Sequence, residues 1–145
     1  MRVVCQRVTE ARVRVGGRIV AEIAEGLCIL VGVARADSPE VAGRLAGKVA
    51  RLRVFPDADG RFDRSLQDAG GAALVVSQFT LIADTAKGNR PSFAPAAAPE
   101  EAEPLYERFC SELEALGVPV GRGVFGAKME VELVNDGPVT VIIDA

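Results

Sequence analysis

The segment EARVRV, residues 10–15, alternates strictly between apolar and polar side chains. A period of two is typical of a β-strand that buries one face and exposes the other. Gly16-Gly17 follows at once, and a pair of glycines between two extended segments favours a tight hairpin. The segment RIVAEI, residues 18–23, then supplies the returning strand. This feature commits the first part of the chain to an antiparallel pair of strands.

Further segments predict the rest of the fold. Residues 27–33, LCILVGV, are apolar throughout, which is typical of a central strand covered on both faces. Residues 37–52 and 100–116 repeat apolar side chains at helical spacing. Shorter extended segments are expected at 53–55, 72–83, 128–133 and 139–144, with a loop at 84–99. Residues 1–145 are therefore expected to form a single α+β domain, with largely antiparallel β-sheet layers and two main helices packed on one side.

The two predicted helices differ in how clearly they begin. Asp37 or Ser38 can cap the first helix through a side-chain oxygen. In the second, Pro104 lies inside the apolar repeat, and a proline costs about 3 kcal/mol within a helix. The second helix therefore starts at Pro99 and kinks at Pro104, or it starts near Glu103.

Composition argues against several classes of protein. The chain contains no histidine, which removes the usual zinc sites, the commonest general base and every Ser-His or Cys-His nucleophile. Its three cysteines are widely spaced, so we expect buried thiols, no metal ion and no cofactor. The net charge of −3 argues against extensive duplex binding, so no DNA partner is expected. Without a leader pattern, and with its longest apolar stretch at 26–34, the chain is expected in the cytoplasm without a membrane partner.

Two stretches carry polar residues in positions that could support catalysis or ligand binding. SQFTL, residues 77–81, puts polar side chains into an otherwise apolar strand, where they need partners or a solvent-facing side. KGNRPSF, residues 87–93, marks a turn, and its Lys87 and Arg90 could meet a phosphate. Each stretch also has an ordinary structural reading, because such strands and such loops are common.

A third stretch, VNDGPVT at residues 134–140, poses a question about the backbone. Asn-Asp-Gly between two apolar runs favours a hairpin turn. Pro138 then stands where a returning strand would begin, although proline cannot donate to a sheet ladder. Gly137-Pro138 is therefore either an awkward turn or a piece of backbone displayed for a purpose.

Taken together, these stretches closely resemble the bacterial D-aminoacyl-tRNA deacylases, also called D-tyrosyl-tRNA deacylases. The likeness covers essentially the whole chain and is carried, in order, by QRVTEARVRV, GLCILVGV, LVVSQFTL, GNRPSF and VNDGPVT. It implies hydrolysis of the ester between a D-amino acid and the 3′ terminal adenosine of tRNA, and also removal of glycine mischarged on tRNA(Ala). It further implies a homodimer whose partner is aminoacyl-tRNA.

The resemblance assigns the Gly-Pro stretch a role in chirality. By residue match, Gly137 and Pro138 form a Gly-cisPro gauge that enters the active site of the other subunit. The main-chain carbonyls of the gauge would hold the α-amino group of the substrate, so that an L side chain collides while a D side chain points outwards. Arg7 matches the arginine that steadies this motif; its ordinary reading is an exposed charge on a strand.

The resemblance also implies a catalytic stretch that works without imidazole, formed by Ser77, Gln78, Phe79 and Thr80. Backbone N–H groups near Phe79 and Thr80 would stabilise an oxyanion, while the substrate 2′-hydroxyl assists. Gln78 would help to orient the adenosine end. Thr80 could bond the substrate, but without a base it is a poor nucleophile.

Further contacts with the tRNA end follow from the same match. Phe125 and Met129 correspond to an apolar adenosine slot, where stacking of a base on an aromatic ring contributes about 1–3 kcal/mol; otherwise they are core residues near the start of a strand. The expected loop contacts are Lys87, Asn89, Arg90, Pro91, Ser92 and Phe93.

Two other functions stay open at this point. The chain could be a dimeric module that binds a nucleotide end or a small ligand without turnover. It could also be a peptidase built on Ser77 or Ser92, although neither has an evident base.

Overall fold

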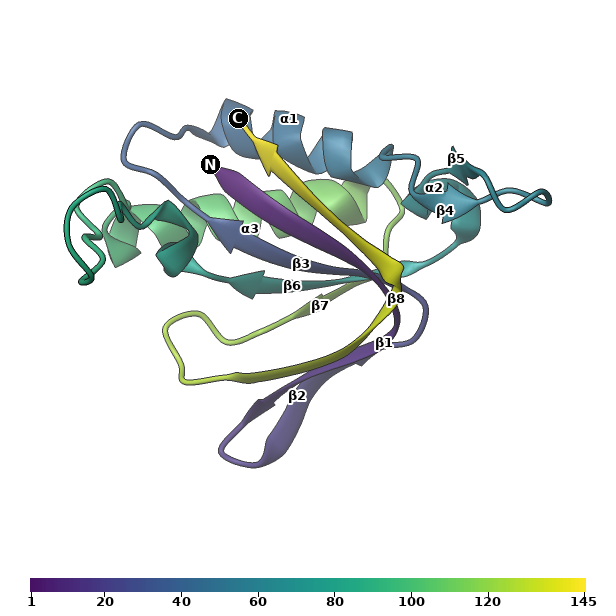
Figure 1. The fold of residues 1–145 in the computed structure, drawn as a ribbon, viewed down its shortest axis with the longest axis horizontal. Coiled ribbons are helices and arrows are strands. Elements are labelled where there is room, and N and C mark those ends of the chain that lie inside the picture. The colour runs from purple at the N-terminus through teal and green to yellow at the C-terminus, as the bar shows by residue number, and fades with distance from the viewer.

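A computed structural model describes residues 1–145, which form one mixed six-stranded sheet, a two-stranded sheet and helices (Figure 1). The elements are β1 (Arg2–Val15), β2 (Arg18–Ile23), β3 (Gly26–Gly32), α1 (Pro39–Ala50), β4 (Phe55–Pro56), β5 (Phe62–Arg64), α2 (Leu66–Ala69), β6 (Ala72–Ser77), the 3-10 helix η1 (Phe79–Ile82), α3 (Pro99–Ala115), β7 (Val120–Arg122) and β8 (Glu130–Asp144). The prediction of an α+β fold is confirmed.

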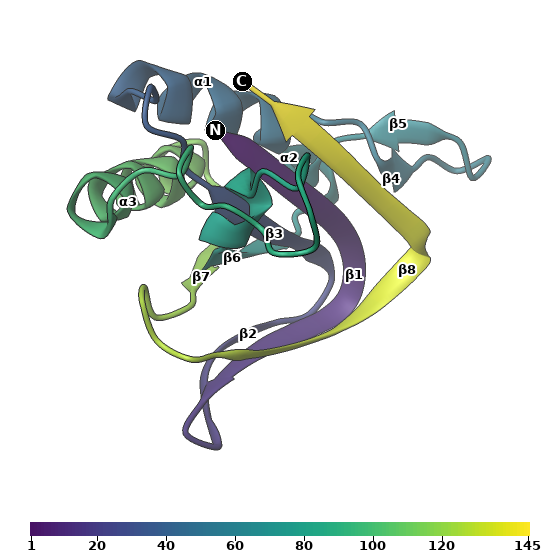
Figure 2. The same cartoon turned by 60° about the vertical axis from the view of Figure 1, so that its left-hand side comes forward.

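Strand β1 organises the main sheet. Its first half pairs antiparallel with β3, its second half pairs antiparallel with β2, and β8 pairs with it along both halves. On the other side of β3, strands β6 and β7 continue the sheet in parallel. Figure 2 shows β1 and β8 bending together, so that their lower halves and β2 curve away from the helices. The sheet separates two cores, because alternate residues of β3 and β6 enter a large core under the helices and a smaller one on the other face, inside the curve.

Helices α1 and α3 lie together on one face of the sheet, as predicted (Figure 1). The side chain of Ser38 caps α1 by accepting a hydrogen bond from the N–H of Val41. Helix α3 begins at Pro99 and contains Pro104, so of the two starting points considered for it the one near Glu103 is wrong. Burial of an apolar face that includes Phe109 stabilises this helix despite the missing N–H of its internal proline.

Two of the expected strands differ in the structure. The segment expected to stay extended over 72–83 leaves the sheet after Ser77 and continues as η1, where the N–H of Leu81 donates to the carbonyl of Gln78. The strand expected at 53–55 is instead the short β4, Phe55–Pro56, paired with β5. The polar residues at the carboxyl end of β6 therefore begin a helical turn and do not extend the ladder with β3.

The expectation of a hairpin turn within VNDGPVT is wrong. Asn135 lies opposite Val8 and Thr140 opposite Gln6, so the two predicted strands on either side of the stretch are halves of one strand, β8. The residues between them form an irregularity opposite Arg7 in a ladder that resumes in the same direction. The Gly137-Pro138 peptide bond is cis, as the resemblance implied.

The three cysteines are free and buried, which confirms the reading of plain thiols. Burial raises the pKa of Cys5 and of Cys110 to about 12, and that of Cys28 to about 11. No helix of this structure combines the length and the apolar character that a membrane span requires.

Candidate active site

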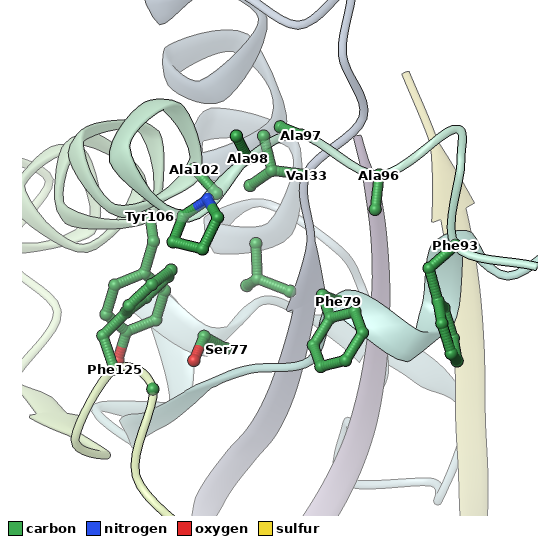
Figure 3. A pocket seen from close by; sticks show the side chains of 13 residues that line it. Val33, Ser77, Phe79, Phe93, Ala96, Ala97, Ala98, Ala102, Tyr106 and Phe125 are labelled. Carbon is green, nitrogen blue, oxygen red and sulfur yellow. The ribbon is translucent and has the colours of Figure 1, made fainter.

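A cavity of about 420 Å³ opens at the carboxyl end of β6. Most of its lining is apolar, and no acidic or basic side chain contributes to it. Figure 3 shows Tyr106 and Phe125 together at one end of the cavity, and Phe79 and Phe93 at the other. The residues come from β3, β6, η1, the loop before α3, the first turns of α3 and the segment after β7. A pocket of this size and polarity is the usual form of a small-ligand site.

The stretch from Ser77 to Thr80 borders this cavity because β6 ends there. The N–H of Gln78 donates to the carbonyl of Val31 at 2.7 Å, which is the last bond to the neighbouring strand before the chain turns. In η1 the first bond within the turn comes from the N–H of Leu81. The N–H groups of Phe79 and Thr80 precede that bond, so they are in the position where a helix start leaves donors for a ligand.

Side chains of this stretch are placed in different surroundings. Ser77 is half-buried and lines the cavity, whereas Phe79 and Thr80 are exposed. The amide of Gln78 donates to the hydroxyl of Thr80. Thr80 therefore has an amide as its side-chain neighbour and no base, which agrees with its expected weakness as a nucleophile.

Aromatic rings shape both ends of the cavity. The rings of Phe79 and Phe93 meet edge to face with centroids 5.0 Å apart. At the other end, the ring centroids of Phe125 and Tyr106 are 6.0 Å apart. The hydroxyl of Tyr106 donates to the carbonyl of Val75 at 2.7 Å. Burial raises the pKa of Tyr106 above its ordinary value, so the hydroxyl stays protonated and keeps this bond. The bond ties α3 to β6 directly beneath the site.

The two residues matched to the adenosine slot lie on different sides of the Ser77–Phe79 segment. Phe125 lines the large cavity, while Met129 lines a smaller hollow of about 230 Å³ that shares Ser77, Phe79 and Gly126 with it. Both side chains are half-buried. They border open space next to Ser77 and Phe79 and also contact the core.

Only one of the expected loop residues reaches the cavity. The loop is closed at its base by reciprocal backbone hydrogen bonds between Asp84 and Ser92, at 2.8 and 2.9 Å. Phe93, which follows this pair, lines the cavity. The other expected contacts are exposed and line no part of it: Lys87, Asn89, Arg90, Pro91 and Ser92.

The gauge residues lie far from the cavity of their own chain. Gly137 and Pro138 are exposed at the bend of β8, at the opposite end of the sheet from η1 (Figure 1). The bend of β8 lies opposite Arg7 of β1, so three strand spacings, through β1 and β3 to β6, and about four residues of strand separate it from Ser77, which amounts to roughly 20 Å. Within one chain, Gly137-Pro138 and the segment from Ser77 to Thr80 do not meet.

Two side chains bind the backbone around the gauge. Arg7 is 9% exposed and donates to the carbonyls of Val54, at 2.7 Å, and Asp136, at 3.3 Å. Arg7 is therefore not the exposed strand charge of its ordinary reading. The amide of Asn135 donates to the carbonyls of Arg7, at 2.8 Å, and Val139, at 3.0 Å. Sequence reasoning did not identify Asn135, although an asparagine beside Asp-Gly-Pro is a residue type that often bonds to nearby backbone.

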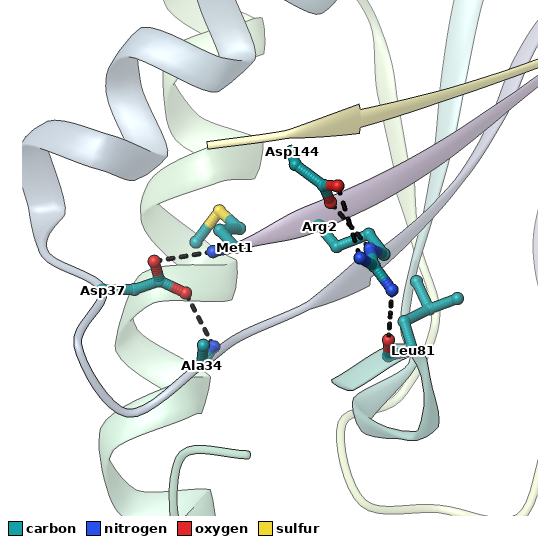
Figure 4. Close-up of polar contacts among 6 residues, drawn as sticks. All are labelled: Met1, Arg2, Ala34, Asp37, Leu81 and Asp144. Atoms are coloured by element: carbon teal, nitrogen blue, oxygen red, sulfur yellow. Dashed lines mark hydrogen bonds and ion pairs between the residues drawn. The ribbon is translucent and has the colours of Figure 1, made fainter. Parts of the chain in front are cut away.

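A further contact reaches η1 from the ends of β1 and β8. Arg2 pairs with Asp144 at 2.6 Å and donates to the carbonyl of Leu81 at 3.2 Å (Figure 4). The bond holds the last turn of η1 against the sheet. Arg2 carried no signal in the sequence, where the first strand was expected only at residues 10–15; in the structure β1 begins at Arg2.

Comparisons with known proteins agree with this architecture. The family described as D-Tyr-tRNA(Tyr) deacylase matches residues 4–144. A D-aminoacyl-tRNA deacylase of Roseiflexus castenholzii is 59% identical over 145 residues, which is 100% of this chain and 92% of that protein. A D-aminoacyl-tRNA deacylase of Deinococcus radiodurans is 56% identical over 144 residues, which is 99% of each chain.

Solved structures share the fold over its whole length. The structure of a c-Myc DNA Unwinding Element Binding Protein superposes with a TM-score of 0.95 at 39% identity, covering 100% of this chain and 99% of that one. A probable eukaryotic D-amino acid tRNA deacylase superposes with a TM-score of 0.86 over 99% of this chain and 98% of that one; at 19% identity, it supports the fold alone. Because a family model matches nearly the entire chain, and full-length relatives share more than half of its residues, this chain belongs to the D-Tyr-tRNA(Tyr) deacylase family.

Proposed function

We propose that this protein hydrolyses the ester that joins a D-amino acid to the terminal adenosine of tRNA, and that it also removes glycine from tRNA(Ala). The products are the free amino acid and intact tRNA, so the reaction is a chiral proofreading step for translation. Family membership supports the enzyme class, a D-aminoacyl-tRNA deacylase, and an aminoacyl-tRNA substrate implies the cytoplasm. The observation that carries the proposal is the apolar cavity at the end of β6, bordered by the leading N–H groups of η1 and by no charged side chain.

The chemistry needs little from side chains. An aminoacyl ester is already activated towards water, so the protein can accelerate hydrolysis by positioning the ester and stabilising the oxyanion. The N–H groups of Phe79 and Thr80 are the donors that we assign to this oxyanion. The vicinal 2′-hydroxyl of the ribose assists the attacking water. This hydroxyl takes the role that an imidazole has in other hydrolases, since the chain has no histidine.

The adenosine end has apolar surface available on either side of the catalytic stretch. We assign the base to the ring of Phe125 and the thioether of Met129, with Gln78 helping to orient the ribose end. Phe93 closes the cavity from the loop side, while the exposed Lys87 and Arg90 lie on the same loop and are free to meet the tRNA backbone.

Selectivity for the D-configuration requires a second subunit in this scheme. The gauge is separated from the catalytic stretch of its own chain by roughly 20 Å, so it can act on the substrate only in the site of a partner. Gly137 and Pro138 are exposed at a bend of the edge strand β8, in a position to enter a neighbouring molecule. We therefore propose a homodimer in which each gauge completes the other site. Main-chain carbonyls that hold only the α-amino group leave the identity of the D side chain unread.

Single-turnover hydrolysis of D- and L-aminoacyl-tRNA by the purified protein tests the activity. We expect rapid release of the D-amino acid and retention of the L-ester. Binding of both esters without hydrolysis would instead favour the non-catalytic binding module. Cleavage of a peptide substrate that Ser77→Ala or Ser92→Ala abolishes would favour the peptidase.

Subunit complementation tests the shared site. Ser77→Trp fills the cavity, and Gly137→Ala alters the gauge, so each variant alone should be nearly inactive. Random pairing of equal amounts makes about half of the dimers mixed, and each mixed dimer has one intact site, so about one quarter of wild-type activity should return. A mixture as inactive as its components, with sedimentation showing mixed dimers, would contradict a site shared between subunits.

A further inference from the structure

Phe62 is an aromatic side chain in an unusual position. It belongs to β5, a strand of three residues, and 57% of its surface is exposed. Its ring faces the guanidinium of Arg7, with the central guanidinium carbon 5.7 Å from the ring centroid. This distance lies within the range of a cation–π contact, so the exposed ring has a partner that an aliphatic residue would not serve equally well.

Arg7 receives the rest of its contacts from two directions. On the side of the β4–β5 hairpin, the carbonyl of Val54 accepts at 2.7 Å. On the side of the gauge, both the carbonyl and the carboxylate of Asp136 lie 3.3 Å from its Nε atom. A guanidinium buried to this extent is held in one place by such a set of partners.

The guanidinium also limits the space available to the gauge. A Cβ atom added to Gly137 would lie 3.3 Å from a terminal nitrogen of Arg7. The guanidinium of Arg7 therefore packs against the backbone at Gly137, so a shift of the guanidinium changes the packing of that backbone.

The hairpin that carries Phe62 is itself anchored next to it. Arg53 donates from Nε to the carbonyl of Asp63 at 2.9 Å and also pairs with the carboxylate of that residue. Arg64 donates to the carbonyl of Asp68 at 2.9 Å. With the backbone fixed on both sides, Phe62 presents its ring to Arg7 from a supported position.

We propose that Phe62 is a positioning residue: its ring and the Val54 carbonyl clamp Arg7, and through Arg7 they hold Gly137-Pro138 in the geometry that rejects L-aminoacyl esters. The effect on selectivity rests on the proposed function, but the contact between Phe62 and Arg7 can be tested without any substrate. The β4–β5 hairpin is thereby part of the selectivity apparatus, although it lies outside the cavity.

The substitutions Phe62→Ala, Phe62→Leu and Phe62→Tyr separate the ring from simple apolar cover. We expect Phe62→Ala and Phe62→Leu to lower the ratio of D- to L-ester hydrolysis about two- to fivefold, the range of an exposed cation–π contact, while Phe62→Tyr keeps the wild-type ratio. Arg7→Lys should lower the ratio as well. In a double variant, Phe62→Ala should lower the ratio no further than Arg7→Lys does alone. Ile19→Ala, which trims a comparably exposed apolar side chain on β2, is the matched control and should leave the ratio unchanged.

A second measurement does not depend on activity. The Nε–H of Arg7 should exchange slowly with solvent in the wild type, and about tenfold faster or more in Phe62→Ala, by nuclear magnetic resonance. Unchanged exchange in Phe62→Ala, or a Phe62→Leu variant with the wild-type D-to-L ratio, would overturn the clamp. Dissociation of Phe62→Ala into monomers would also overturn it, because the ring would then act at the subunit interface. If the exchange result holds but the wild type hydrolyses no D-ester, the proposed function fails while the clamp stands.

Discussion

Asn135→Asp perturbs the backbone of the gauge with almost no change in shape. In the wild type, one amide group donates to two carbonyls, those of Arg7 at 2.8 Å and Val139 at 3.0 Å. The other atom of the side chain, Oδ1, accepts from the hydroxyl of Thr140 at 3.4 Å, which fixes the orientation of the amide. A carboxylate in this place has no donor, so three acceptor oxygens would face one another.

The magnitude follows from the bonds removed. Each hydrogen bond contributes about 1 kcal/mol net, and charge against two carbonyls adds to the loss, so we expect the free energy of unfolding to fall by about 2–3 kcal/mol. For a domain of this length the melting temperature should fall by roughly 6–10 °C. Because the strand resumes on both sides of the irregularity, the fold should survive while turnover of the D-ester decreases.

The loss should also depend on pH. Only the protonated form of the introduced carboxyl group can donate, so its pKa in the folded state should be raised above the ordinary value of about 3.9. A raised pKa of an acid means that the penalty is fully present above the folded pKa and is relieved as the pH falls through it. The gap in melting temperature between variant and wild type should therefore be larger at about pH 8 than at about pH 4.5.

The assay is thermal unfolding monitored by circular dichroism, with Asn89→Asp as the control. Asn89 lies in the exposed loop, so the same change of amide to carboxylate costs little there. If Asn135→Asp melts within about 1 °C of Asn89→Asp at about pH 8, then the two carbonyl bonds do not hold the gauge and the reasoning is refuted.

Further expectations concern the site and the core. Thr80→Ala and Ser77→Ala should each reduce D-ester hydrolysis less than about tenfold, as for the loss of one hydrogen bond; a trapped acyl-enzyme in the wild type, absent from Thr80→Ala, would show covalent catalysis instead. Gly137→Ala should lower both activity and melting temperature, because its Cβ would lie 2.8 Å from Cγ2 of Val139 at a φ of +126°; wild-type values for both would contradict this. Incubation with a chelator should leave hydrolysis unchanged, since no group of acidic or cysteine side chains is placed to hold a metal ion, and recovery of lost activity on adding one metal would be the opposite result. The three buried cysteines, with pKa values raised by burial, should react with a thiol reagent only after denaturation; rapid labelling of the native protein at about pH 8 would argue against their burial.

Much of the fold follows from local patterns in the sequence. The hairpin of β1 and β2, the buried strand β3 and the helix capped by Ser38 were all predicted, because alternation, continuous apolarity and capping act between neighbouring residues. The motifs that carry the family resemblance also marked Ser77 and Phe79, which border the cavity, and the Gly-Pro stretch of β8.

Only the tertiary structure decided how those pieces are used. The VNDGPVT stretch has the local chemistry of a turn, yet β1 is long enough to pair with both of its flanks and so makes it an irregularity within one strand. Likewise, the extended pattern at the end of β6 gives way to η1, where the chain reaches the rim of the sheet. At the VNDGPVT stretch long-range pairing overrides local propensity, because a ladder of backbone bonds and the burial of a strand face outweigh the preference of a few residues. At the end of β6 the pairing with β3 stops at Ser77, so the extended pattern beyond it has no ladder to join.

The contacts of Arg7 make the same point for the site. Its partners Val54, Phe62 and Asp136 are distant in sequence and share no motif with it, so no local pattern could have brought them together. The separation of roughly 20 Å between the gauge and Ser77 likewise follows from strand order and register. The sequence by itself determined which residues we assign to the chemistry, whereas the pairing of β1 with three other strands decided where each one lies, since register is a property of the whole sheet.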